Sequence, residues 1–353
     1  MVIQQYTIQT TPKYNFPQPT IDTTLPQRFI EQSLHSLRKV QSPTVQLNQQ
    51  NIQQTLQLSL EPILLKPRHE ETPIAAIDTS NMKIGETATG ILIAVRGATV
   101  HKQNRHYTYM RLGPFIFHVT EENKKEVFTQ LQTAYFTNSH ALAEAHGILN
   151  IAQMPTRIAN ILEKWLQTTI AKTLSNNLIL FDGSLTAGTP DTSTRIMKET
   201  LSHAREKSNI VLAFSKMTTL RINGQIITEM PQQHKPPYML EAVGLKPKPP
   251  ITLFGDIYVA RLNHGNYAFR LDIDKELSPE QRIIAVEKLL GNDLLLQGYP
   301  ETLRLAHILC TFTANEVIAM QHFIRRKYGL KLMNRPDIHR LLFGPFGKGE
   351  SYA

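Results

Sequence analysis

Two short apolar segments, each ending in an aspartate, constrain the fold of this chain more than any other feature. They are residues 74–78, IAAID, and residues 178–182, LILFD. Short apolar runs rich in β-branched and aromatic residues are typical of buried strands. Between them, residues 154–174 repeat apolar side chains at the spacing of an amphipathic helix. The pattern predicts an α/β domain in which two strands each end on a carboxylate.

Further segments with strand or helix patterns extend this domain toward the C-terminus. Strands are expected at residues 88–100 and 209–216 and at two segments within 106–120, HYTYMRL and FIFHVT, with a hairpin over 251–274. Helices are expected at residues 194–208 and 278–290, followed by two more after residue 298, the second capped near Thr313. Ser278, Pro279 and Gln281 carry the signature of a capping box. Together these elements predict a mixed sheet with helices on its faces.

The first seventy residues differ in composition from the rest. Residues 1–25 are rich in Thr, Pro and Gln, and residues 27–40 have helical spacing. Residues 47–60 are rich in Gln but keep apolar side chains four positions apart, which favours a polar helix used for assembly. We therefore expect an N-terminal arm and helical segment over 1–70 and a catalytic domain over 71–345.

Charge and cysteine content limit the partners and the chemistry. The formal net charge is +9, which favours polyanionic partners such as DNA, although many proteins are basic for other reasons. The one cysteine, Cys310, excludes an internal disulfide and a zinc cage built on cysteines, and its apolar neighbours predict burial. No apolar run approaches the ~20 residues that cross a bilayer, and the N-terminus lacks the pattern of a secretory signal. We expect a cytoplasmic, DNA-associated protein with no membrane segment.

The aspartates at the strand ends are candidate metal ligands. Asp78 and Asp182 on neighbouring strands can share divalent ions, because Mg²⁺ and Mn²⁺ prefer carboxylate oxygen. The alternative is that each aspartate only begins a turn. Glu163, at the margin of the apolar stripe of the helix at 154–174, is the candidate third acid, with Glu144 as its rival. The alternative role for Glu163 is a surface charge that pairs with its helix neighbours.

The order of the motifs resembles the NurA family of DNA nucleases. The motifs are IAAIDTS, a helix with a glutamate, LILFDGSL, LAFSK and GYPETLRLAH, and the resemblance covers residue 74 to the C-terminus. It implies an RNase H-like mixed sheet flanked by helices. It also implies Mn²⁺- or Mg²⁺-dependent cleavage with two ions, acting as a 5′-to-3′ exonuclease and a single-strand endonuclease in DNA end resection. The implied partners are DNA, a HerA-like hexameric ATPase and a second copy of the chain.

The resemblance assigns roles to individual residues. It makes Asp78, Glu163, Asp182 and His307 metal ligands, and it adds Tyr299 to the catalytic group. Lys216 corresponds to the lysine of the SK motif and is expected to contact the substrate.

One position departs from the family pattern, because Thr79 stands where glycine is usual. Three of the implied roles have structural alternatives. His307 shares a helix face with Leu303 and could be an inward core residue, Tyr299 could simply pack, and Lys216 could be a solvated lysine.

The sequence therefore predicts a metal-dependent DNA nuclease, and two other classes of protein stay open. A noncatalytic DNA-binding or clamp subunit would keep the charge and the fold, and Thr79 is the feature in its favour. A metal-dependent phosphatase-like hydrolase would use similar acids on a small substrate, against which the basic charge argues.

Overall fold

The computed structural model describes residues 56–135, 150–189, 192–230 and 234–333. The chain divides into two compact units, Met1–Gln53 and Gln54–Ala353. The first unit lies outside the described residues, as do the helix expected at 27–40 and the rival acid Glu144. All the described strands and helices belong to the second unit.

The strands and helices of this unit follow the predicted order closely. The strands are β1 (Gln57–Leu58), β2 (Ile63–Leu64), β3 (Ile74–Glu86), β4 (Gly90–Gln103), β5 (His106–Thr120), β6 (Leu178–Asp182), β7 (Thr186–Ala187), β8 (Ile210–Ser215), β9 (Arg221–Ile222), β10 (Gln225–Ile226), β11 (Tyr238–Val243), β12 (Thr252–Leu253), β13 (Gly255–Arg261), β14 (Phe269–Asp274), β15 (Leu295–Leu296) and β16 (Tyr299–Pro300). The helices are α2 (Lys124–Tyr135), the 3-10 turn η2 (Ile151–Gln153), α3 (Met154–Thr173), α4 (Thr194–Glu206), α5 (Pro279–Asn292), α6 (Glu301–Cys310) and α7 (Ala314–Tyr328). Both predicted helix caps are present as capping boxes, Ser278 with Gln281 at α5 and Thr313 with Glu316 at α7.

Ten of these strands form one mixed sheet, in the order β1-β11-β13-β14-β8-β6-β3-β4-β5, with β2 also paired to β11. β4 pairs antiparallel to both β3 and β5, whereas β6 pairs parallel to both β3 and β8. β14 then pairs antiparallel to β8 and begins the antiparallel half with β13 and β11. The predicted α/β fold class, a mixed sheet flanked by helices, is confirmed.

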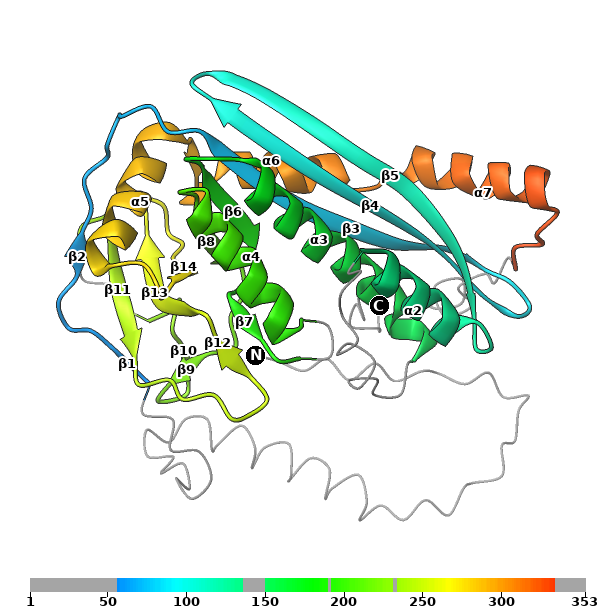
Figure 1. Ribbon diagram of the computed structural model, residues 1–353, viewed down its shortest axis with the longest axis horizontal. Coiled ribbons are helices and arrows are strands. Elements are labelled where there is room, and N and C mark those ends of the chain that lie inside the picture. The colour runs from blue at the N-terminus through cyan, green and yellow to red at the C-terminus, as the bar shows by residue number, and fades with distance from the viewer. Residues whose placement is uncertain (1–55, 136–149, 190–191, 231–233, 334–353) are drawn as a thin grey trace, which may run out of the picture. The chain divides into compact units, whose positions relative to one another are not determined.

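Helices cover both faces of the sheet, and alternate residues of the central strands face each layer (Figure 1). On β6, Ile179 and Phe181 pack with α3 and α4, whereas Leu178 and Leu180 pack with α5 and α6. On β4, Gly97 lets α3 approach closely, because a Cβ there would lie 2.7 Å from Leu166 Cδ1. The core is therefore two apolar layers separated by the sheet. Among the described residues, no helix is long and apolar enough to span a membrane.

Three elements differ from the prediction. β3 does not end at Asp78 but runs on to Glu86, because its pairing with β4 continues through this stretch. The segment at 106–120 is one strand. The helix expected at 47–60 is wrong at its C-terminal end, where Gln57–Leu58 pairs with β11; backbone pairing there outweighs the weak helical spacing.

Residues 66–72 are also part of this unit, because they lie along α5. Glu287 accepts hydrogen bonds from Lys66 N at 3.0 Å and from Arg68 Nε at 2.6 Å. Asn292 Oδ1 accepts from Thr72 N at 3.2 Å. These contacts tie residues 66–72 to α5.

The contact between this segment and α5 makes a prediction at Gly291. A Cβ there would lie 1.9 Å from Arg68 O, and backbone cannot rotate away as a side chain can. Helix propensity alone would make Gly291→Ala stabilising by about 1 kcal/mol. We expect instead a loss of about 1–3 kcal/mol from overpacking, measured by urea unfolding. A variant more stable than the wild type would show that residues 66–72 do not hold this position.

Candidate metal centre

Asp78 lies in β3, one residue beyond the end of the parallel pairing between β3 and β6. Pairing between β3 and β6 stops at Ile77 with Phe181, whereas pairing with β4 continues past Asp78 to Glu86. Asp78 faces the same layer as Ala76, toward α6, and it is only 6% exposed. The expectation of a carboxylate at the end of a strand is wrong for Asp78. Asp78 is nevertheless the first residue of β3 beyond its pairing with β6.

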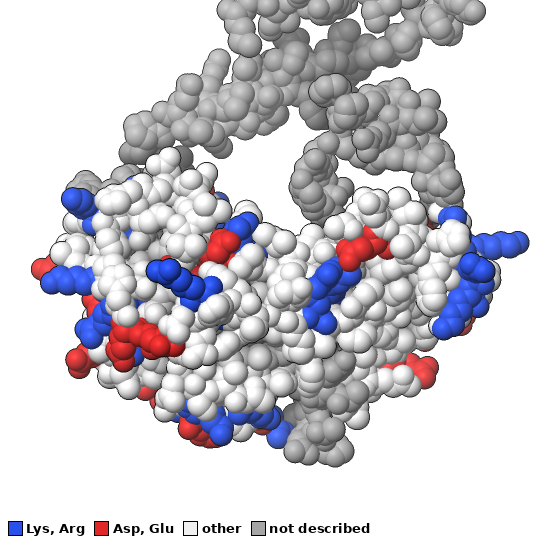
Figure 2. Space-filling model, turned by 90° about the horizontal axis from the view of Figure 1, so that it is seen from above, with Lys and Arg blue, Asp and Glu red and all other residues white. Residues whose placement is uncertain are grey.

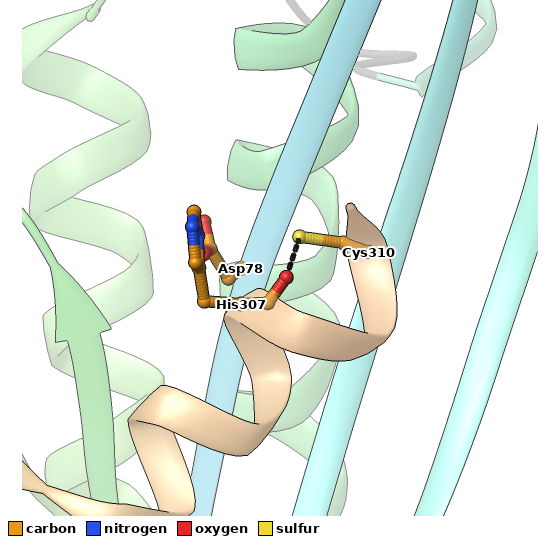
Figure 3. A group of neighbouring side chains, drawn as sticks. All are labelled: Asp78, His307 and Cys310. Atoms are coloured by element: carbon orange, nitrogen blue, oxygen red, sulfur yellow. Dashed lines mark hydrogen bonds and ion pairs between the residues drawn. The ribbon is translucent and has the colours of Figure 1, made fainter. Parts of the chain in front are cut away.

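His307 of α6 is the direct partner of Asp78 (Figure 3). Its Nδ1 lies 2.7 Å from Asp78 Oδ2. The imidazole is 53% exposed, so the inward core position considered from the sequence is wrong. Leu303, Ala306 and Cys310 occupy the buried stripe of α6, and His307 lies at its border. With Nδ1–H donated to the carboxylate, Nε2 keeps a lone pair that can take a proton or a metal ion.

Asp182 ends β6, as predicted, and forms an ion pair with Lys216. The Lys216 Nζ donates to Asp182 Oδ2 at 2.7 Å. The chain turns at Gly183, which has a φ of +106° that disfavours other residues. Gly183 N donates to Phe214 O at 2.8 Å, and Ser215 Oγ donates to Gly183 O at 2.8 Å. The turn is therefore tied to β8, and Lys216 is a paired lysine rather than a freely solvated one.

Glu163 approaches Asp78 from the α3 side of the sheet. Its Oε2 lies 3.5 Å from Thr79 Oγ1, the side chain next to Asp78, and its Oε1 accepts from Gln167 Nε2 at 2.8 Å. Lys164 Nζ lies 3.7 Å from the same Oε1. Both helix neighbours expected for a surface charge are in contact with it, but Glu163 is not a surface charge, because its side chain is only 18% exposed.

Thr79 itself fits the site. It has no positive φ, and its backbone N–H donates to Asp78 Oδ1 at 2.7 Å. The departure from glycine at this position therefore requires no strained backbone.

The three acids act on one another electrostatically. Burial raises the pKa of Asp78, and the negative charge of Asp182 raises it further, against the lowering effect of His307. Burial also raises the pKa of Glu163, with smaller contributions from the charges of Asp78 and Asp182. Desolvated carboxylates that repel one another are stabilised by a cation placed among them.

Tyr299 is buried beside these acids with an unsatisfied hydroxyl. It is 8% exposed, and its Oη has no hydrogen-bond partner among the described residues. Its ring packs edge-on against Phe214, and Lys216 Nζ lies 5.3 Å from the ring centroid. Burial raises the pKa of Tyr299, and Asp182 and Asp78 raise it further, so the phenol stays protonated and can donate. Packing accounts for the ring but not for the hydroxyl.

Sequence reasoning placed Cys310 in the core and missed its position at the site. It is fully buried, as predicted, and its Sγ lies 3.2 Å from His307 O. The ligand atoms of Asp78, His307 and Cys310 all lie within 4.8 Å of one another. The spacing of three residues from His307 on one helix was the signal that could have found it.

Asp272 of β14 is a second residue that the sequence did not single out. It is fully buried, it is held by Arg270 through Nε and Nη2 at 2.7 Å each, and its Oδ2 accepts from Leu185 N at 3.0 Å. It therefore positions the turn that follows Asp182. Nothing in its local sequence, FRLDID, distinguishes it from other strand aspartates.

The donor types fit a hard divalent cation. Among the described residues, the ligand atoms that all lie within 4.8 Å of one another are those of Asp78, His307 and Cys310, and Asp182 and Glu163 are outside this group. Asp78, Asp182 and Glu163 offer carboxylate oxygens, and His307 offers an imidazole nitrogen, which are ligands that Mn²⁺ and Mg²⁺ accept. Cys310 does not belong to that set, because hard cations do not favour a thiol and burial raises its pKa. The unsatisfied hydroxyl of Tyr299 is consistent with a site that receives a further polar group.

Comparison with known proteins finds similarity in structure alone. No family model matches the chain, and no curated protein matches its sequence. The solved structures similar to it include NurA nucleases. The NurA nuclease from Sulfolobus solfataricus is 14% identical, with a TM-score of 0.48, covering 89% of this chain and 99% of that one. A NurA structure bound to dAMP and manganese is 10% identical, with a TM-score of 0.44 and coverages of 87% and 98%. Endonuclease V from Bacillus subtilis is 11% identical, with a TM-score of 0.34 and coverages of 85% and 94%.

The raised pKa of Glu163 predicts a pH-dependent effect of Glu163→Gln on stability. Because the folded state holds the proton more tightly than the unfolded chain, the ionised carboxylate destabilises the fold. This penalty is absent below the ordinary pKa of 4.5 and grows as the pH rises through the folded-state value. We therefore expect the metal-free variant to melt at a higher temperature than wild type at pH 7–8 and at a similar temperature near pH 4.

Glu199→Gln, at an exposed ion pair with Arg195 on α4, is the matched control and should show no such gain. A Glu163→Gln variant that melts lower than the wild type at pH 7 would contradict the account of Glu163 as a destabilising buried charge.

Proposed function

We propose that this chain is a metal-dependent deoxyribonuclease that hydrolyses phosphodiester bonds. The observation that carries the proposal is the set of Asp78, Asp182 and Glu163. These acids come from two strands and a helix near the end of the pairing between β3 and β6, and burial, together with the charges of the other acids, raises the pKa of Asp78 and Glu163. Such a set serves a reaction that needs divalent cations next to a polyanionic substrate. For packing alone, buried repulsive carboxylates would only reduce stability.

Each residue has a role that follows from its position. Asp78 and Asp182 hold Mn²⁺ or Mg²⁺, two ions by the proposal, with Glu163 and His307 completing the set. When bound, the ions activate water and stabilise the leaving oxygen. His307, held through Nδ1 by Asp78, is placed to take or give a proton at Nε2.

Two further side chains are suited to bind the phosphate. Lys216 pairs with Asp182 in the metal-free protein and becomes available to the phosphate when a cation replaces it. Tyr299 offers its unsatisfied hydroxyl as a donor to a substrate or water oxygen.

DNA is the proposed substrate because the chain is basic. With a net charge of +9, phosphate contacts release condensed counterions and favour binding without sequence readout. Figure 2 shows Lys and Arg side chains spread over the face seen from above, including its middle, several with acidic neighbours. The attraction is therefore distributed over the surface.

The family resemblance of the motifs extends the proposal. By that resemblance, the chain acts as a 5′-to-3′ exonuclease and single-strand endonuclease in DNA end resection, as a homodimer with a HerA-like ATPase. The Gln-rich N-terminal segment is the part of the chain we assign to that assembly.

We predict that Asp78→Ala and Asp182→Ala each reduce cleavage of labelled DNA with Mn²⁺ by at least ~10³-fold, in line with the loss of transition-state charge stabilisation. The variants should fold, because neither removes an apolar core residue. Chelation with EDTA should abolish wild-type cleavage, and added Mn²⁺ should restore it. Asp256→Ala, at a partly exposed ion pair with Arg282, is the control that should cleave normally. Cleavage by either site variant at the wild-type rate would remove that residue from the site.

His307→Ala should lower turnover far more than it lowers stability. Because the imidazole is half exposed, its loss leaves no core cavity, and the melting temperature should change little. Loss of a proton carrier or ligand should reduce initial rates by roughly 10²-fold. His203→Ala on α4, where the ring pairs with Glu206, tests the same change at an unrelated acid–histidine pair. A fully active but destabilised His307→Ala protein would show that the residue is structural.

A further inference from the structure

We propose that Asp78, His307 and Cys310 form a site for Zn²⁺, and that Zn²⁺ bound there inhibits cleavage. The inhibitory part rests on the nuclease function proposed above; the binding site itself does not. Cys310 is the residue that makes this site different from a site for Mn²⁺ or Mg²⁺.

The geometry brings three kinds of ligand together. His307 and Cys310 are three positions apart on α6 and lie on adjoining parts of its surface, and Asp78 reaches them from β3 (Figure 3). Their ligand atoms lie within 4.8 Å of one another. Zinc bonds of about 2.0–2.3 Å place tetrahedral ligand atoms roughly 3.5 Å apart, so small side-chain rotations complete the site.

Of the two ligands on α6, His307 is the one with room to rotate, because Cys310 is fully buried. The hydrogen bond described for Cys310 Sγ is a weak one, to His307 O of its own helix at 3.2 Å. The His307 ring is half exposed and can move outward to let an ion enter between Nδ1 and Asp78 Oδ2. Three protein ligands leave the fourth position of a tetrahedral ion open to water.

The chemistry of the donors selects zinc. A thiolate, an imidazole and a carboxylate suit Zn²⁺, whereas Mn²⁺ and Mg²⁺ gain nothing from sulfur. At a mixed nitrogen, oxygen and sulfur site, Zn²⁺ also binds more tightly than Mn²⁺ in the usual order of divalent metals. Binding breaks the S–H bond, forms a zinc–sulfur bond and releases the proton to solvent.

Inhibition follows because the two metal sites share residues. Zn²⁺ on Asp78 and His307 occupies a carboxylate and an imidazole that the proposed reaction needs. Tetrahedral zinc also withdraws Asp78 from the set formed with Asp182 and Glu163. Zinc would therefore compete with Mn²⁺ rather than replace it.

The test uses the full chain freed of metal with EDTA and titrated with Co²⁺, a spectroscopic substitute for Zn²⁺. We expect one Co²⁺ per chain with a near-ultraviolet thiolate-to-cobalt charge-transfer band, which Zn²⁺ then bleaches. Cys310→Ser should lose the band. Because Cys310 is the single cysteine, protection of the wild-type thiol by Zn²⁺ from a thiol reagent gives a second readout without any substitution.

Activity provides the third readout. Zn²⁺ should inhibit Mn²⁺-supported cleavage by the wild type, and Cys310→Ser should need at least ~10-fold more Zn²⁺ for the same inhibition, the loss expected for one ligand. Cys310→Ser alone should cleave normally with Mn²⁺. If the serine variant does not fold, Cys310→Ala and the thiol-protection assay on the wild type decide the point.

The outcomes separate the two proposals. Cobalt bound without a thiolate band, or a thiol that reacts equally fast with and without Zn²⁺, overturns the zinc site. Equal zinc inhibition of wild type and Cys310→Ser overturns the role of Cys310. A thiolate band in a chain that never cleaves DNA supports the zinc site and overturns only the nuclease function.

Discussion

The parallel pairing of β3 with β6 is the contact on which the site depends. It begins at Ile74 with Leu178 and stops at Ile77 with Phe181. Up to that point both strands are fully buried, because helices cover both faces of the sheet. Beyond it, β3 continues along β4 while the chain leaves β6 through the turn at Gly183. Asp78 and Asp182 therefore lie just beyond the last paired residues of the two strands, near enough for the charge of Asp182 to raise the pKa of Asp78.

The supporting residues hold the end of this pairing from several directions. Asp272, paired with Arg270, fixes the turn after Asp182 by accepting from Leu185 N. On the other side, the buried Arg96 of β4 donates to Thr311 O and pairs with Glu316, which fixes the corner between α6 and α7. The hydrogen bonds from Arg96 lower the pKa of Glu316 to about 2, so this anchor stays ionised over the whole physiological range. His307 and Cys310 are consequently presented by a helix whose end is fixed.

The residues of the site reduce the stability of the fold. Burial and mutual repulsion raise the pKa of Asp78 and Glu163, and Tyr299 keeps a buried hydroxyl without a partner among the described residues. If these residues served only in packing, each of these features would lower the stability of the fold. A bound cation would make the electrostatic contribution of the carboxylates favourable, because each carboxylate would then be attracted to the cation. The ion pair with Lys216 compensates part of the negative charge of Asp182.

The strands and helices that depend on local sequence patterns could be predicted from the sequence. The apolar runs of β3 and β6, the stripe of α3 and the capping boxes of α5 and α7 are local, because periodicity and hydrogen bonds between near neighbours fix them. The candidate acids Asp78 and Asp182 were identifiable for the same reason, since each follows an apolar run.

The contacts between those elements could not be predicted from local sequence patterns. The length of β3 beyond Asp78 comes from its pairing with β4, which no pattern within β3 announces. His307 is exposed and bound to Asp78 rather than buried, because Leu303, Ala306 and Cys310 fill the inward face of α6. The group of Asp78, His307 and Cys310 joins Asp78 to two residues at least 229 positions further along the chain, and contacts of that range are set by how the helix packs on the sheet.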